Sequence, residues 1–329
     1  MTLIAPTLQS FFTDRLARHT RASEHTIAAY RDTMRLLLGF IQQRIGTSPA
    51  KLDWAQLDAS MVLAFLDDLE HRRGNTIRTR NARLTAIRSL FAYASLLHPE
   101  HAATIAQVLA IPAKRFEKAT ITYLTEIETQ ALLAAPDQTT WEGRRDVVLM
   151  LTAIQTGLRI SELLSLNRGD ITLGAGANVR CEGKGRKHRA VPLNEPVRNA
   201  LAGWLTLTGV GADQPVFTTR IGRRLSADAA RSRLDIHART AAEHCPSLVG
   251  RKLHPHVFRH TSAMNLLHAG VDTTVIALWL GHADVRSTNA YLHADMAIKE
   301  KALAQVTPPS VTIGRYRPPD KLLAFLESL

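Results

Sequence analysis

The sequence predicts a mainly α-helical protein of more than one domain, with one small antiparallel β-sheet in its second half. Three observations lead to this prediction. Apolar residues recur at helical spacing over most of the 329 residues. A stretch containing Pro112 and basic residues interrupts that pattern. Two short segments, 178–182 and 188–193, alternate like strands on either side of a glycine-containing turn, which is typical of a β-hairpin.

Residues 1–110 are predicted to form a first domain of helices joined by short loops. The apolar spacing places helices over residues 8–16, after Ser23, around residues 61–69 and over residues 76–97. The side chain of Ser23 is of the type that caps a helix N-terminus.

Six arginines and no acidic residue lie between Arg72 and Arg88. The fourth predicted helix carries Arg80 and Arg83 on the face opposite its apolar stripe, with Arg78 and Arg88 near the edges of that face. A charge run of this kind is most often a solvated surface. Because acidic residues are missing from it, we favour contact with a phosphate backbone, which supplies affinity and salt sensitivity rather than sequence choice.

Residues 111–121 are predicted to be an exposed linker, followed by a second domain over residues 122–306 and a tail over residues 307–329. Thr125 and Glu128 form a capping box at the start of the second domain.

The turn between the two predicted strands is strongly basic. Its Lys184 could neutralise a DNA phosphate or donate a proton, and Arg186 and Lys187 lie beside it. A further helix is predicted over residues 227–242, and its Arg231 is a candidate for contact along or in a DNA groove.

The balance of charge favours a polyanionic partner. Lys and Arg number 41 against 29 Asp and Glu, which gives a net charge of +12. The two cysteines, Cys181 and Cys245, provide neither a disulfide framework nor a cysteine zinc site, which fits a reducing cytosol. The N-terminus does not have the pattern of a signal peptide, and no apolar run approaches the length of a membrane span.

Four residues with catalytic potential follow one another near the end of the second domain. His256 and Arg259 lie one helical turn apart, and His282 and Tyr291 come after the next predicted helix. Ionising a tyrosine at pH 7 costs roughly 4 kcal/mol, a cost that nearby cations lower, while an imidazole can take the proton. Arginine side chains match the geometry of phosphate oxygens. Arg159, at the junction of two apolar helices, is a further candidate for this role.

Five motifs in this order and spacing resemble the tyrosine recombinases, the phage integrase superfamily. They are Thr156–Leu163 (TGLRISEL), Gly183–Gly185 (GKG), His256–His260 (HVFRH), Leu280–His282 (LGH) and Tyr291–His293 (YLH). The resemblance covers residues 122 to about 300, and residues 8–98 are similar to the helical core-binding domain of that family. The chain departs from the pattern at Phe258, where leucine is commoner in the family.

The resemblance implies a catalytic set of six residues. They are Arg159 and Arg259, which would hold the scissile phosphate, Lys184 as the acid for the 5′-oxygen, His256 as acid/base, His282 as a hydrogen-bond partner of the phosphate, and Tyr291 as the nucleophile that forms a 3′-phosphotyrosine. The 5′-hydroxyl of another strand would then attack that bond, so the backbone is rejoined without metal, ATP or another cofactor.

The expected partners are double-stranded DNA with specific recombination sites, further copies of the chain in a tetramer, and accessory recombinases or architectural proteins. The expected location is the cytoplasm, in association with the nucleoid. The biological role, whether integration, transposition or resolution, stays open. Two other functions also remain possible: a type IB topoisomerase-like nicking-closing enzyme and a non-catalytic DNA-binding regulator.

The tail is predicted to end in a short amphipathic helix over residues 320–329, with Phe325 and Leu326 on its apolar stripe. A helix of this length is too short to be stable alone. It therefore needs a groove, either on its own protomer or on a neighbouring one.

Overall fold

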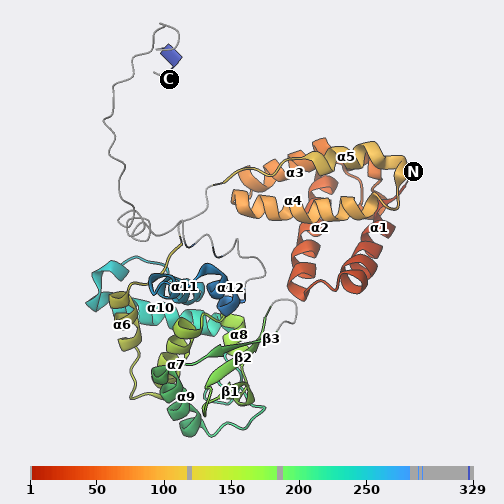
Figure 1. Ribbon diagram of the computed structural model, residues 1–329. Coiled ribbons are helices and arrows are strands. Elements are labelled where there is room, and N and C mark those ends of the chain that lie inside the picture. Colours follow the sequence, from red (N-terminus) through yellow and green to blue (C-terminus); the bar gives the residue numbers. More distant parts are fainter. Residues whose placement is uncertain are drawn as a thin grey trace, which may run out of the picture. The chain divides into compact units, whose positions relative to one another are not determined.

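The computed structural model describes residues 2–116, 121–183, 188–281, 288, 291 and 325–326. Over these residues the protein is mainly helical with one small antiparallel sheet, which confirms the predicted fold class. The chain divides into two compact units, residues 1–119 and 120–329 (Figure 1). Each unit has a hydrophobic core of its own.

The first unit is built from helices around a core rich in aromatic residues. They are α1 (Ile4–Ser10), a π-helical segment (Phe11–His19), α2 (Glu24–Ile45), α3 (Ala59–His71), α4 (Ile77–Ala94), α5 (Ala102–Ala110) and the short 3₁₀ turns Pro49–Lys51, Trp54–Gln56 and Pro99–His101. Helix α4 packs against α2, α3 and α5 (Figure 1). Ser23 caps α2 as predicted, since its Oγ accepts a hydrogen bond from the backbone N–H of Thr26 at 3.2 Å.

The second unit contains seven helices among its described residues. They are α6 (Glu126–Ala134), α7 (Trp141–Thr156), α8 (Ile160–Ser165), α9 (Glu195–Thr208), α10 (Ala227–His244), α11 (His256–His268) and α12 (Thr273–Leu280), together with the 3₁₀ turns Arg168–Asp170 and Pro246–Leu248. Helix α7 packs against α6, α9 and α11, so it connects most of this core. The predicted capping box of Thr125 and Glu128 is confirmed.

Three strands form the sheet in the order β1 (Ile171–Thr172), β2 (Asn178–Glu182) and β3 (His188–Pro192). Strands β2 and β3 are the predicted hairpin, and Val179 lies opposite both Ile171 and Val191. The two-residue strand β1 was not predicted, because so short a segment shows no alternation of its own. Residues 184–187 of the turn, and with them the candidates Lys184, Arg186 and Lys187, lie outside the described residues.

Helices α7 and α12 both end at a glycine in the left-handed conformation, Gly157 with φ 64° and Gly281 with φ 66°. A Cβ atom on Gly157 would lie 2.5 Å from Cδ2 of Leu280 and 2.9 Å from Oγ of Ser262. Only glycine satisfies both this backbone conformation and this lack of space. The C-terminal end of α7 therefore packs directly against α11 and α12.

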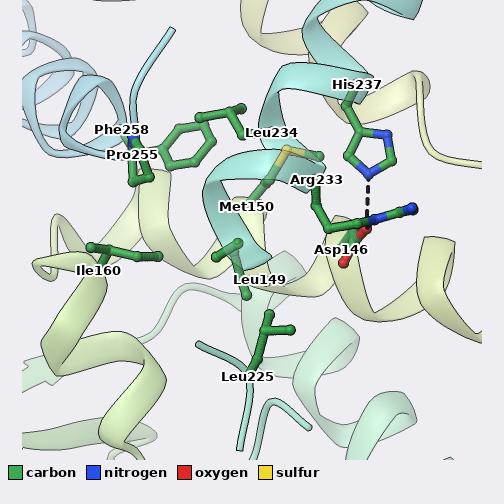
Figure 2. A pocket seen from close by; sticks show the side chains of 11 residues that line it. Asp146, Leu149, Met150, Ile160, Leu225, Arg233, Leu234, His237, Pro255 and Phe258 are labelled. Atoms are coloured by element: carbon green, nitrogen blue, oxygen red, sulfur yellow. Dashed lines mark hydrogen bonds and ion pairs between the residues drawn. The ribbon is translucent and has the colours of Figure 1, made fainter. Parts of the chain in front are cut away.

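A buried carboxylate on α7 anchors helix α10. Asp146 accepts hydrogen bonds from Nε of Arg145 at 2.9 Å and from Nε of Arg233 at 2.6 Å, and its Oδ2 lies 2.8 Å from Nε2 of His237. Figure 2 shows Arg233 and His237, both from α10, pointing toward Asp146. The adjoining hollow leaves about 10 Å³ for the centre of a water molecule, so it holds one water at most. The network is therefore structural.

Replacing Asp146 by Asn is expected to lower the free energy of unfolding by about 3–5 kcal/mol at pH 7, because buried cationic groups lose their counterion. Burial alone would raise the pKa of Asp146, but hydrogen bonds and charges from His237, Arg145 and Arg233 outweigh it and hold the pKa below its ordinary value. The stabilisation is thus present above a pH of about 4 and is lost as the pH falls through the folded-state pKa.

Denaturant unfolding at pH 7 and pH 3 measures this difference, with Asp235→Asn, at an exposed position on α10, as the matched control. The control is expected to stay within about 0.5 kcal/mol of the wild type. A loss for Asp146→Asn that is equally large at both pH values would contradict the proposed electrostatic origin.

Both cysteines are free and buried, and burial raises the pKa of Cys181 to about 11. None of the helices in the described part of the chain has the length and apolar character needed to cross a membrane.

Candidate active site

Arg259 is buried where the C-terminal ends of two helices meet. It is 1 % exposed, and its Nη1 and Nη2 atoms donate hydrogen bonds to the carbonyls of Gly157 at 2.8 Å and Leu280 at 2.7 Å. The ends of α7 and α12 carry partial negative charge, which suits a guanidinium. Burial and the charge of Arg159 lower the pKa of Arg259 to about 10, so it remains charged at pH 7. Two of its five N–H donors are used here, which leaves donors for a phosphate.

A single carboxylate holds two further arginines. Oε1 of Glu162 accepts a hydrogen bond from Nη1 of Arg159 at 2.7 Å, and Oε2 accepts one from Nη2 of Arg189 at 2.7 Å. A further contact is at the start of α8, where the backbone N–H of Arg159 donates to Oε2 of Glu162 at 2.9 Å. Burial alone would raise the pKa of Glu162, but these arginines outweigh it and lower the pKa. Glu162 is therefore ionised and fixes the position of Arg159.

Arg189 also lies against the turn that follows α12. A Cβ atom on Gly281 would lie 2.7 Å from Nη1 and 3.1 Å from Cδ of Arg189, so a larger residue here would displace the Arg189 side chain. Gly281 directly precedes His282, which lies outside the described residues. Arg189 thus connects the carboxylate that holds Arg159 to the segment leading to His282.

His256 opens helix α11 one turn before Arg259. Partial burial of its ring lowers its pKa, and the charges of Arg259, His254 and Arg159 act in the same direction. At neutral pH His256 is therefore an uncharged imidazole that can accept a proton or a hydrogen bond.

Tyr291 is buried, with 4 % of its surface exposed. Its ring packs in a cluster with Met264 and Leu280, and its hydroxyl lies 3.0 Å from Nδ1 of His260. Burial raises the pKa of Tyr291, although the positive charges of Arg259 and Arg159 oppose the rise. The phenol is therefore neutral in the protein without DNA.

The structure thus brings four of the six predicted catalytic residues into one electrostatic environment: Arg159, His256, Arg259 and Tyr291. Lys184 and His282 lie outside the described residues. In the part of the chain that the structure describes, no group of three His, Cys, Asp or Glu side chains is placed to hold a metal ion.

Two residues of this site were missed in the sequence. Arg189 and Val191 are two residues apart on β3, so period-two spacing assigns both to the same face of the sheet. Val191 is buried. An arginine on the buried face of a strand was the available signal. His260 is next to Arg259 in sequence, but nothing in the sequence indicated that it would contact Tyr291.

The arginines of α4 differ from the predicted exposed face. Arg80 is 2 % exposed; its Nε lies 3.3 Å from Glu70 of α3, and its Nη1 donates to the carbonyl of Pro112 at 3.3 Å. Arg88 donates to the carbonyl of Ile111. The prediction that Arg80 lies on an outer face is wrong, because its acidic partner comes from a neighbouring helix rather than from α4 itself.

The remaining candidates for DNA contact are arranged differently. Arg78 on α4 and Arg231 on α10 are exposed, and Arg83 is half-buried, with its pKa lowered chiefly by burial. Arg78 and Arg231 are therefore accessible to a phosphate backbone.

A pair of variants on α4 separates the two kinds of arginine. Arg80→Gln is expected to lower the free energy of unfolding by about 1–3 kcal/mol, because Glu70 loses its buried partner and keeps Lys114, which is 42 % exposed. Arg78→Gln is expected to change it by less than about 0.5 kcal/mol, but to reduce the slope of log Kd for DNA against log salt concentration by about 1. Denaturant unfolding and DNA titrations over a salt series measure both, and an unchanged salt slope for Arg78→Gln would remove it from the interface.

Comparison with known proteins agrees with this geometry. Residues 122–297 match the model of the phage integrase family, and residues 10–96 match its N-terminal SAM-like domain. The putative integrase/recombinase y4rC of Sinorhizobium fredii is 49% identical to this protein, over a region that covers 99% of this chain and 98% of the S. fredii protein. Tyrosine recombinase XerC of Pseudomonas fluorescens is 32% identical, over a region that covers 86% of this chain and 90% of that XerC.

A solved structure supports the fold alone. The Tn1549 transposon integrase in complex with circular intermediate DNA superposes with a TM-score of 0.69 at 16% identity, covering 92% of this chain and 99% of that one. The chain therefore belongs to the phage integrase family and is a tyrosine recombinase, an enzyme that breaks and rejoins DNA in site-specific recombination.

Proposed function

We propose that this recombinase cuts DNA by attack of the Tyr291 hydroxyl on a backbone phosphorus. The observation that carries the proposal is the position of Tyr291, whose phenol lies within the electrostatic influence of Arg159 and Arg259. The attack forms a 3′-phosphotyrosine and releases a 5′-hydroxyl. The 5′-hydroxyl of another strand reverses the step, so the energy of the broken bond is kept in the protein–DNA link and no ATP is used.

Each remaining residue of the predicted set has a role in this scheme. Arg159 and Arg259 hold the non-bridging oxygens and stabilise the charge that grows on them in the transition state. Neutral His256 serves as a hydrogen-bond and proton-transfer partner. Lys184 supplies the proton that the leaving 5′-oxygen requires, and His282 donates a hydrogen bond to the phosphate.

The raised pKa of Tyr291 sets the order of events. Ionising the free phenol at pH 7 would cost more than roughly 4 kcal/mol, so a standing phenolate is not formed. Proton loss is instead coupled to attack on the phosphate. This coupling protects the nucleophile from reacting before DNA is bound.

The protein acts on double-stranded DNA that carries its recombination sites. Residues 1–110 form the core-binding domain, residues 111–121 the linker and residues 122–306 the catalytic domain, followed by the tail. Exposed Arg78 and Arg231, with Arg83, Arg186 and Lys187, are proposed to contact the phosphate backbone. Exchange of two duplexes needs four active subunits, which fits a tetramer on DNA, with accessory proteins, in the nucleoid of the cytoplasm.

A suicide substrate tests the proposed chemistry. A duplex bearing the recombination site and a nick a few nucleotides beyond the scissile phosphate loses, after cleavage, the short fragment that carries the new 5′-hydroxyl, so the covalent complex accumulates. We expect this complex to form in the presence of a chelator, with DNA attached to the peptide that contains Tyr291. Cleavage that requires a divalent ion and leaves no attached protein would contradict the proposal.

The same experiment separates the two alternative functions. A topoisomerase-like enzyme relaxes supercoiled plasmids without the recombination site, whereas the proposed enzyme acts only where the site is present. A non-catalytic regulator binds the suicide substrate but forms no covalent complex.

A further inference from the structure

A second histidine lies beside the nucleophile, and it is a different residue from the acid/base of the predicted set. Nδ1 of His260 is 3.0 Å from the hydroxyl of Tyr291, and the two rings meet edge to face with centroids 5.6 Å apart. This distance is within the range of a hydrogen bond to a phenol. His260 therefore touches the oxygen atom that would attack phosphorus.

The environment of Tyr291 makes a directly placed proton acceptor useful. Burial dominates over the neighbouring arginines and leaves the pKa of the phenol above its ordinary value. Donors aimed at a phosphate stabilise the transition state but do not remove the phenolic proton. A base within hydrogen-bond reach of that proton can accelerate the step by about 10²–10⁴-fold.

His256 lies one helical turn before His260 on α11, and the two rings meet edge to face with centroids 4.6 Å apart. Its pKa is lowered by burial and by positive neighbours, among them Arg259 and Arg159. His256 therefore shares the surroundings of the arginines that would hold the phosphate, whereas His260 faces the phenol.

We propose that His260 is the catalytic base that accepts the proton of Tyr291 during strand cleavage and returns it during rejoining. This inference rests on the proposed role of Tyr291 as nucleophile. Before cleavage, the proton of the neutral imidazole is on Nε2 and Nδ1 accepts from the phenol. In the step, the Tyr291 O–H bond breaks and its proton moves to Nδ1, the bond from Oη to phosphorus forms, and the bond from phosphorus to the 5′-oxygen breaks.

A second proton transfer takes place at the leaving 5′-oxygen, on the other side of the phosphate. The released 5′-oxygen takes a proton from an acid, which is Lys184 in the proposed function. On rejoining, the incoming 5′-hydroxyl gives its proton back to that acid, and protonated His260 returns its own to the departing phenolate. No metal, oxidant or second substrate enters either direction.

The test is the rate of covalent complex formation by His260→Gln on the suicide substrate, compared with His268→Gln. His268 is on the same helix, exposed, and its ring packs near Tyr123. We expect the first variant to be slower than wild type by about 10²-fold or more and the control to be unchanged. DNA affinity and thermal unfolding are measured for both, and His260→Asn serves as a second variant if the longer amide does not fit.

Two modified reactants distinguish a proton acceptor from a structural residue. With sulfur in place of the bridging 5′-oxygen, the leaving group departs without protonation, since a thiol has a pKa of about 8.5. On this substrate the reduction in cleavage rate caused by His260→Gln is expected to persist, whereas the reduction caused by a substitution of Lys184 is expected to disappear. A fluorinated tyrosine at position 291, with a more acidic phenol, is expected to reduce the loss caused by His260→Gln at least tenfold.

Two results would overturn the assignment of His260 as the catalytic base. They are a His260→Gln variant that cleaves at the wild-type rate, or one whose defect is the same with tyrosine and with fluorotyrosine. Either result leaves the proposed function standing provided that the wild-type adduct maps to Tyr291. An adduct on another residue would remove the proposed function itself, so the two failures are distinguishable.

Discussion

Tyr291→Phe is expected to abolish formation of the covalent protein–DNA complex, with a loss of at least about 10⁴-fold in cleavage rate. The substitution removes the one oxygen that can bond to phosphorus, and neither His260 nor the arginines can replace it as a stable nucleophile. The phenyl ring keeps its packing against Met264 and Leu280. The hydrogen bond to His260 is lost, which costs about 1 kcal/mol of stability.

The measurement combines cleavage and binding. Quenched-time gels follow the covalent complex on the suicide substrate, and titration of intact site DNA gives the affinity, which is expected to change less than about threefold. Tyr123→Phe is the matched control, because it makes the same chemical change at another tyrosine of the same unit. A Tyr291→Phe protein that still forms the covalent complex would assign the nucleophile to another residue.

The arrangement of helices in this protein follows from signals that are local in sequence. Ser23 and Thr125 cap α2 and α6 because a side-chain oxygen reaches a backbone N–H three residues later. The hairpin of β2 and β3 follows in the same way from alternation on either side of a glycine turn. Such interactions span a few residues, so the residues themselves define them.

The errors concern partners that are distant in sequence. Arg80 was assigned to an exposed face because α4 has no acidic residue, yet its counterion, Glu70, is on α3. Arg189 was not among the predicted site residues, and it bonds to Glu162, which is 27 positions away. The contact between His260 and Tyr291 spans 31 positions and joins α11 to a residue that follows α12 in the chain. Sequence periodicity identifies the face on which a side chain lies, but not the group that it meets there.

Arg259→Lys is expected to lower both the cleavage rate and the stability of the protein. A lysine keeps the positive charge, but its single ammonium lacks the planar fork that reaches the carbonyls of Gly157 and Leu280 together. The loss of one preorganised donor to a phosphate typically costs about 10²–10³-fold in rate. Leaving a buried helix-end carbonyl without its charged donor costs, in addition, about 1–3 kcal/mol of folding free energy.

Arg159→Lys provides the comparison that separates these two effects. Arg159 is one-third exposed and its partner Glu162 retains Arg189, so its substitution is expected to reduce the cleavage rate about as much but the unfolding free energy by less than about 1 kcal/mol. Denaturant unfolding and single-turnover cleavage at saturating protein measure the two quantities independently. Equal stability of both variants would mean that the carbonyl contacts of Arg259 contribute nothing to the fold. A loss of stability confined to Arg259→Lys would show that one guanidinium both binds the phosphate and holds the ends of α7 and α12 together, so that the geometry of the site is set by the same bonds that stabilise the domain.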